Sequence, residues 1–193
     1  KKNLEVYLLQ VRPLNIKTKW SKHKEKNFKN FLTKNQKKIE KTFLKKNKKL
    51  FGVKTIYGQM PDWNPAEIIG TCPRMLSYSL YKKLITNNIW KKSRFLMGYN
   101  NPHEKNLMVS FGGQPYIDVR LSLNSFLPSK LPERIKEKLV NHWIEQLKLN
   151  PVLHDKIEFD LAITCFSFDL DKKIKNLVSN SLSKNEKKIY IES

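Results

Sequence analysis

A Gly-Gly pair followed by strict alternation of apolar and polar residues is the feature that most constrains the fold of this chain. Gly112 and Gly113 stand between two short apolar runs, which is the signal of a tight turn in a hairpin. The residues that follow form an apolar set and a polar set: Ile117, Val119, Leu121 and Leu123, against Tyr116, Asp118, Arg120, Ser122 and Asn124. Because neighbouring side chains of a strand point to opposite faces, the pattern predicts a strand over residues 116–124.

The polar face of this predicted strand is unusual for a chain so rich in lysine. It presents a phenol, a carboxylate, a guanidinium, a hydroxyl and an amide, and no lysine. Two interpretations stay open: a structural ladder of ion pairs, or a concave binding face in which Arg120 takes a carboxylate or phosphate and Asp118 orients it. Tyr116, Asp118, Arg120 and Asn124 are therefore candidates for substrate binding.

Positive charge is concentrated near the start of the chain. The net charge is +21, and residues 17–50 hold fourteen lysines against two acids, Glu25 and Glu40. The pattern predicts a basic amphipathic helix that joins two regions, with an apolar face made of Phe28, Leu32, Ile39 and Phe43. A nucleic-acid-binding module is the alternative function. We do not favour it, because these cations are all lysine and no aromatic-rich strand is present to stack bases.

The stretch "YGQMPDWNPAEIIG" at residues 57–70 has the chemistry of a helix start. Asn64 is a good N-cap, Pro65 suits the first helical position, and Glu67 stands three residues after the cap. Capping does not explain the two residues before the cap, Asp62 and Trp63. These two residues are therefore candidates for a binding site.

The remaining patterns predict an α+β or α/β fold with a mixed sheet and packed helices. Residues 4–13 read as a buried strand with Gln10 and Arg12 on one face. Further strands are expected around residues 54–57, within 156–171 and at 183–193, and helices at 74–91, 132–149 and 172–182. The apolar face of the first of these helices is expected to consist of Leu76, Leu80, Tyr81, Leu84 and Ile85.

Several classes of protein are not indicated by the sequence. No P-loop or GxGxxG follows a strand, and Cys72 and Cys165 are not at zinc-ligand spacing. The four histidines are scattered and none sits in a recognisable ligand pair, so a surface or packed role is favoured over catalysis for each of them. The longest apolar runs are far shorter than the roughly 20 residues that span a bilayer. We expect a cytoplasmic protein without a membrane partner.

The stretch "YLLQVRPL" resembles the closing strand of the ATP-grasp nucleotide domain in the family of phosphoenolpyruvate synthase and pyruvate phosphate dikinase. The resemblance implies that Gln10 contacts the nucleotide and its metal ion, and that Arg12 contacts the phosphates. ATP and Mg²⁺ are then the expected cofactors, held mainly by parts of the parent protein outside this chain.

The stretches "PDWNPAEIIG" and "GGQPYIDVRLSLNSFLPSKLP" resemble the middle region of the same family, closest to its subgroup of capsule-associated L-glutamine kinases. The resemblance implies three parts: the end of an ATP-grasp domain (1–16), a lysine-rich helical linker (17–53) and a central α+β domain (54–193). It also implies an enzyme fragment whose phosphohistidine lies in other domains of the parent polypeptide, and which alone would be inactive. No catalytic residue is assigned within the chain.

The acceptor implied by this resemblance is a small molecule, either L-glutamine or pyruvate. Arg74 or Arg120 would clamp the carboxylate that both acceptors carry. Asp62 or Asp118 would meet the ammonium and amide groups that only glutamine offers, which favours glutamine.

Overall fold

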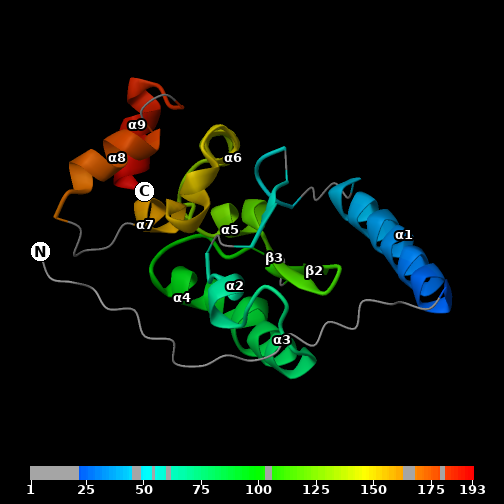
Figure 1. Ribbon diagram of the computed structural model, residues 1–193. Helices are drawn as coiled ribbons and strands as arrows, with labels where there is room; N and C mark the ends of the chain where they lie inside the picture. Colours follow the sequence, from blue (N-terminus) through cyan, green and yellow to red (C-terminus); the bar gives the residue numbers. More distant parts are fainter. Residues whose placement is uncertain are drawn as a thin grey trace, which may run out of the picture.

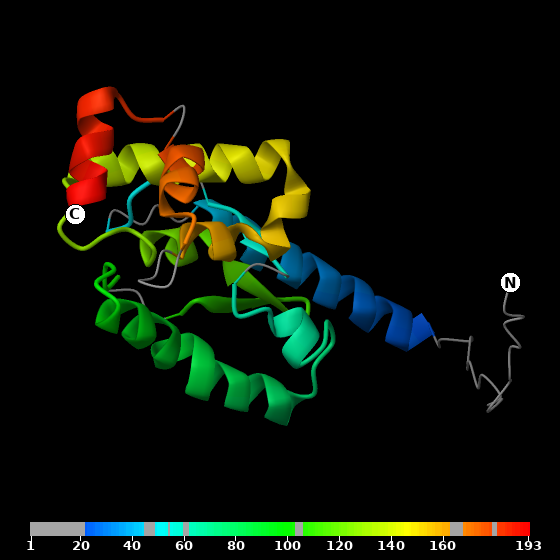
Figure 2. The ribbon, with the colours of Figure 1, turned by 90° about the vertical axis from the view of Figure 1, so that its left-hand side faces the viewer.

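The computed structural model describes residues 22–44, 49–53, 55–59, 62–102, 106–162, 168–178 and 181–193. These residues form helices packed around a small antiparallel sheet, so the predicted α+β class is confirmed (Figure 1). The lysine-rich segment forms the predicted helix, α1 (Lys22–Leu44), which extends away from the other elements in Figures 1 and 2. No helix among the described residues is long and apolar enough to cross a membrane.

The sheet has three strands in the order β1-β3-β2. They are β1 (Tyr57–Gly58), β2 (Met108–Phe111) and β3 (Gln114–Asp118). The predicted hairpin is confirmed: Gly112 and Gly113 both have positive φ, at 60° and 87°, and β2 pairs with β3 on either side of them. Glycine suits such a turn because it has no Cβ to clash in the left-handed region.

The predicted strand over residues 116–124 is wrong beyond Asp118. The chain turns there into the short helix α5 (Val119–Asn124), and the Asp118 carboxylate caps it by accepting from the Leu121 N–H at 3.1 Å. Every residue of α5 is buried, because Leu121 packs in one hydrophobic cluster and Leu123 in the other. Alternation misled the interpretation because both sides of this segment lie inside the protein.

A long helical segment covers one side of the sheet. It consists of α3 (Met75–Tyr81), the π-helix η1 (Lys82–Ile89) and α4 (Trp90–Leu96), and the short α2 (Pro65–Ile68) precedes it. The helix therefore continues five residues past the predicted end at Lys91. Tyr81 and Trp90 are buried against Leu107, Met108 and Ile117. Leu76, Leu80 and Leu84 are exposed, so the expected apolar face is only partly turned inward.

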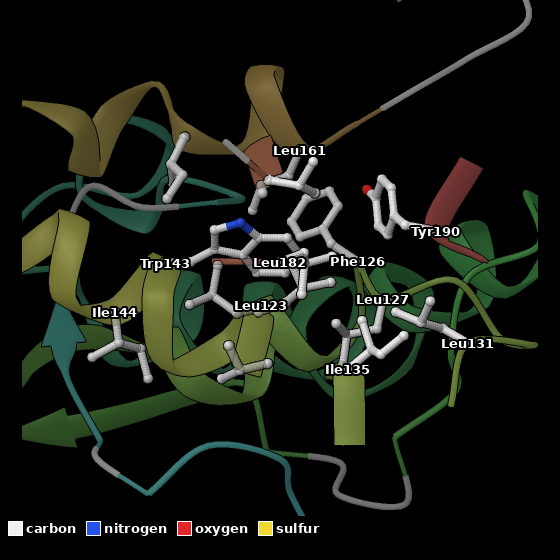
Figure 3. Close-up of a cluster of buried hydrophobic side chains, with 14 of the residues drawn as sticks. Leu123, Phe126, Leu127, Leu131, Ile135, Trp143, Ile144, Leu161, Leu182 and Tyr190 are labelled. Carbon is white, nitrogen blue, oxygen red and sulfur yellow. The ribbon is translucent and has the colours of Figure 1, made fainter. Parts of the chain in front are cut away.

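The larger hydrophobic cluster lies between α5 and the C-terminal helices (Figure 3). The predicted helix at 132–149 is confirmed as α6 (Glu133–Leu149), and its Leu139 and Trp143 are buried in this cluster. The other elements here are the 3-10 helix η2 (Pro151–Asp155), α7 (Ile157–Leu161), α8 (Leu170–Val178) and α9 (Lys184–Glu192). Leu161 of α7 and Tyr190 of α9 complete the cluster around Trp143.

Two strands predicted in the C-terminal third are helices instead. The strand expected within 156–171 is replaced by α7 over its described first part, and residues 163–167 lie outside the described ranges. The final predicted strand is α9. Its start has a complete capping box, in which Ser183 and Glu186 each accept from the other's backbone N–H. This local signal outweighs the short "IYI" run.

Candidate functional site

Asp62 and Arg94 form an ion pair inside the protein, with Asp62 4% and Arg94 6% exposed. Arg94 donates to one oxygen of the Asp62 carboxylate, and the Ser122 hydroxyl donates to the other at 2.6 Å. The second terminal nitrogen of Arg94 donates to the Ser125 hydroxyl. Every oxygen of this buried carboxylate therefore has a partner, which is what burial of a charge requires.

The backbone around Asp62 is held in a conformation that few residues adopt. Asp62 has φ 41° and Trp63 has φ 53°, both in the left-handed region. The Tyr81 hydroxyl donates to the carbonyl of Trp63, and the Asn64 side chain accepts from the Glu67 N–H at 3.2 Å. The predicted helix start at Asn64 is thus confirmed. Strain of this kind is often found at functional sites.

A cavity of about 310 Å³ lies against this ion pair. Its lining comes from the segment before α2, from α4 and α7 with the residues that follow each of them, and from the turn after α5: Asp62, Trp63, Ser93, Arg94, Met97, Tyr99, Phe126, Glu158, Phe159 and Ala162. The Arg94 guanidinium lies 3.6 Å from the centre of the Phe126 ring, a cation–π contact that covers one of its faces. The cavity is therefore largely apolar with a charged cluster in its wall.

Two polar atoms of residues that line this cavity have no hydrogen-bond partner among the described residues. They are Nε1 of Trp63 and Oε2 of Glu158, both shielded from solvent. Burial is the main cause that raises the pKa of Glu158. Its own backbone N–H acts in the opposite direction, the nearby Asp62 charge raises the pKa further, and the Asp62 backbone N–H and Arg94 lower it. The residues that line the cavity thus include one buried donor and one buried carboxyl oxygen without a partner among the described residues.

Arg120 and Asn124, both candidates from the sequence, lie at a different place. Arg120 is 6% exposed and donates to the backbone carbonyls of Leu50 and Phe51. Asn124 accepts from the Phe51 N–H at 2.8 Å and donates to the Phe51 carbonyl at 3.0 Å. These two side chains therefore fasten the segment before β1 to α5, and they do not line the cavity.

The other candidates are also separate from the cavity. Tyr116 donates to the side chain of Gln114 at 3.1 Å, and Asp118 caps α5. Arg74 is exposed at the start of α3, where its side chain makes no capping bond. Gln10 and Arg12 lie outside the described residues, so their nucleotide-binding role stays a prediction. Of the predicted candidates that the structure describes, the cavity brings together Asp62 and Trp63 alone.

Sequence reasoning missed Arg94, Ser122 and Glu158 as members of this cluster. Arginine is scarce here, with five among 38 basic residues, and two of the five, Arg94 and Arg120, are buried in hydrogen-bonded pockets. Scarcity of arginine in a lysine-rich chain could have singled out Arg94, because its fork geometry suits buried pairing. No comparable signal distinguishes Glu158.

The described ranges contain no group of three or more histidine, cysteine, aspartate and glutamate side chains that could hold a metal ion. Comparison of the chain with family models, with curated proteins and with solved structures gave no match.

Proposed function

We propose that this chain is the acceptor-binding part of an ATP-dependent phosphotransferase of the phosphoenolpyruvate synthase type, and that its acceptor is the side-chain amide of L-glutamine. The cavity beside Asp62 and Arg94 is the proposed binding site. Its volume of about 310 Å³ is at the lower end of the range for small-ligand sites. The enzyme would work in the cytoplasm, where ATP and free glutamine are both available.

The observation that carries this proposal is a buried donor and a buried acceptor, both without a partner among the described residues, on two residues that line one cavity. A primary amide has a carbonyl oxygen that accepts and an NH₂ group that donates. Nε1 of Trp63 would donate to the amide oxygen, and Oε2 of Glu158 would accept from the amide nitrogen. Both atoms are buried without a partner among the described residues, so a ligand that pairs them would remove a desolvation cost.

The charges in the cavity wall favour glutamine over pyruvate. Asp62 and Glu158 are two carboxyl groups, whereas Arg94 is the one cationic side chain among the described residues of the lining and is already paired with Asp62 and Ser125. Pyruvate is an anion without an N–H group, so it has no donor for a hydrogen bond to the Glu158 carboxylate and would be repelled by its charge. Glutamine presents an amide and an ammonium group, both of which donate to carboxylates.

In the proposed reaction the amide nitrogen accepts a phosphoryl group carried on a histidine of another domain. The bond from phosphorus to the histidine breaks as the new P–N bond forms, and the amide nitrogen releases one proton. Glu158 in its ionised form would take that proton. Gln10 and Arg12 would contact the nucleotide, and other domains of the parent polypeptide would supply most of the contacts to ATP and Mg²⁺.

Isothermal titration calorimetry on this chain tests the binding site. We expect L-glutamine to bind and L-glutamate, which replaces the amide with a carboxylate of the same size, to bind at least about tenfold more weakly. Glu158→Gln should narrow or reverse this preference, because it removes the repelling carboxyl group. Equal binding of glutamine and glutamate, or tighter binding of pyruvate, would contradict the proposed acceptor.

Phosphorus NMR tests the chemical step on a polypeptide that also carries the remaining domains. With ATP, Mg²⁺ and glutamine, we expect AMP together with a product that contains a P–N bond. Formation of phosphoenolpyruvate from pyruvate would instead identify pyruvate as the acceptor. ATP left unchanged with both acceptors would contradict the phosphotransferase assignment itself.

A further inference from the structure

The outer side of the long helical segment is apolar and exposed. Five aliphatic side chains form this stripe, and between 46% and 85% of each is exposed. They are Leu76, Leu80, Leu84, Ile89 and Leu96, which we call the outer stripe. Figures 1 and 2 both place α3, and with it the long helix, at the lower edge of the molecule, away from α6, α8 and α9. Monomeric soluble proteins rarely expose a continuous apolar surface of this kind.

The spacing of the outer stripe keeps it on one side of the helix. Its members follow one another at intervals of four, four, five and seven residues. The interval of five falls within and at the end of the π-helix η1, whose turns hold more residues than those of an α-helix. Tyr81, Trp90 and Arg94 occupy the inner side, where they are buried. The stripe is therefore a second apolar face that the core does not use.

The charged residues of the helix that carries the outer stripe are all positive. Residues 75–96 contain no aspartate or glutamate, and Lys83 and Lys92 are exposed along the same helix. The whole chain carries a net charge of +21. An exposed apolar face flanked by lysines is typical of helices that lie in the interface of a membrane with anionic lipids.

We propose that the outer stripe docks on the surface of a membrane that contains anionic lipids, with Leu80 and Leu84 inserted among the lipids and Lys83 and Lys92 near the headgroups. A second copy of the chain fits less well, because two identical lysine-flanked faces would repel each other. The proposal is independent of the phosphotransferase assignment. It departs from the expectation of no membrane partner, because that expectation was based only on the absence of a segment long enough to span a bilayer. A helix that lies in the membrane interface does not need that length.

Vesicle co-sedimentation tests this docking. We expect the chain to sediment with vesicles of phosphatidylcholine mixed with phosphatidylglycerol, and much less with phosphatidylcholine alone. The double variant Leu80→Glu/Leu84→Glu should lose at least about tenfold in apparent affinity, because it removes inserted apolar area and adds repelling charge. The matched control is Leu149→Glu/Val152→Glu, which alters two aliphatic residues near the end of α6 that are more exposed than Leu80 and Leu84.

The comparison of the two double variants decides the outcome. Retained binding in the control with loss in the stripe variant, both with unchanged circular dichroism spectra, supports the proposal. Equal vesicle binding by the stripe variant and the wild type would overturn the proposal. The binding would then belong to another basic surface, such as α1. Absence of wild-type binding would also overturn it. A wild-type dimer that the stripe variant abolishes, without vesicle binding, would identify a second copy as the occupant.

Discussion

Asp62 pairs with Arg94 inside the protein although 32 residues separate them in the sequence. The pair joins the segment before α2 to α4, and through Ser122 and Ser125 it also reaches α5 and the turn that follows it. A buried charge that loses its partner is costly, whereas loss of both charges together is tolerated far better. The pair therefore holds one wall of the candidate site in place.

Arg94→Met should lower the free energy of unfolding by about 3–5 kcal/mol, because Asp62 would stay buried without a cation. Urea denaturation followed by circular dichroism measures this. The double variant Asp62→Asn/Arg94→Met, which leaves no buried charge, should recover part of the loss. A single variant as stable as the wild type would mean that the pair does not support the fold.

Trp63→Phe should weaken glutamine binding by about tenfold. The variant loses the hydrogen bond from Nε1 to the amide oxygen of glutamine, and that oxygen is then buried without a donor. The free energy of unfolding should change by less than about 1.5 kcal/mol, because the removed Nε1 bonds to no described residue and the ring is largely kept. Trp90→Phe is the matched control, since its Nε1 is also buried and bonds to no described residue, but Trp90 is not among the residues that line the cavity. Calorimetry should show unchanged glutamine binding in this control, and equal effects of the two variants would count against the proposed contact.

Arg120→Lys should lower the free energy of unfolding by about 1–3 kcal/mol and leave glutamine affinity unchanged. A lysine keeps the charge but cannot serve the carbonyls of Leu50 and Phe51 with a guanidinium fork. Urea denaturation and calorimetry on the same preparation measure the two quantities. A loss of glutamine binding at unchanged stability would restore Arg120 as an acceptor-binding residue.

Acid should weaken the attachment of α9 through Glu186. The hydrogen bond from Lys138 and that from the Ser183 backbone lower the pKa of Glu186 to about 2, from 4.5. A carboxyl group with a lowered pKa stabilises the fold above its unfolded pKa, and this contribution is lost as the pH falls from 4.5 towards 2.

Glu186→Gln is the variant that isolates this effect, because glutamine can still accept from the Ser183 N–H in the capping box. Denaturation at a series of pH values should show that wild type and variant converge in stability as the pH falls through this window. A constant difference between them across the window would exclude Glu186 as the titrating group.

Features that depend on residue types at a fixed local spacing were predicted correctly from the sequence. The Gly112-Gly113 turn, the Asn64 cap and α6 each depend on neighbouring residues, so the sequence predicts them correctly. The segment from Val119 to Asn124 was not readable, because α5 lies between two hydrophobic clusters and alternation says nothing about burial on both sides.

The candidate site was only half predictable for a related reason. Asp62 and Trp63 were singled out because capping left them unexplained. Arg94 and Glu158 reach the same cavity from α4 and α7, which are distant in sequence, and only the tertiary fold brings them there. The capping box at Ser183 is different: its Ser-x-x-Glu spacing is present in the sequence, and the strand predicted at 183–193 was based on the apolar run that follows it.

The π-helix η1 lies between Tyr81, which donates a hydrogen bond to the Trp63 carbonyl, and Arg94, which donates to Asp62. It therefore determines how far these two side chains are rotated from each other about the helix axis. Each residue of a π-helix advances the rotation less than a residue of an α-helix does. An ordinary α-helix with the same number of residues would turn Arg94 away from Asp62 while Tyr81 stayed in place, whereas deletion of one residue at Asn87 or Asn88 would compensate for most of this rotation. The chain length between these two side chains is thus part of the geometry of the cavity, as much as their identity is.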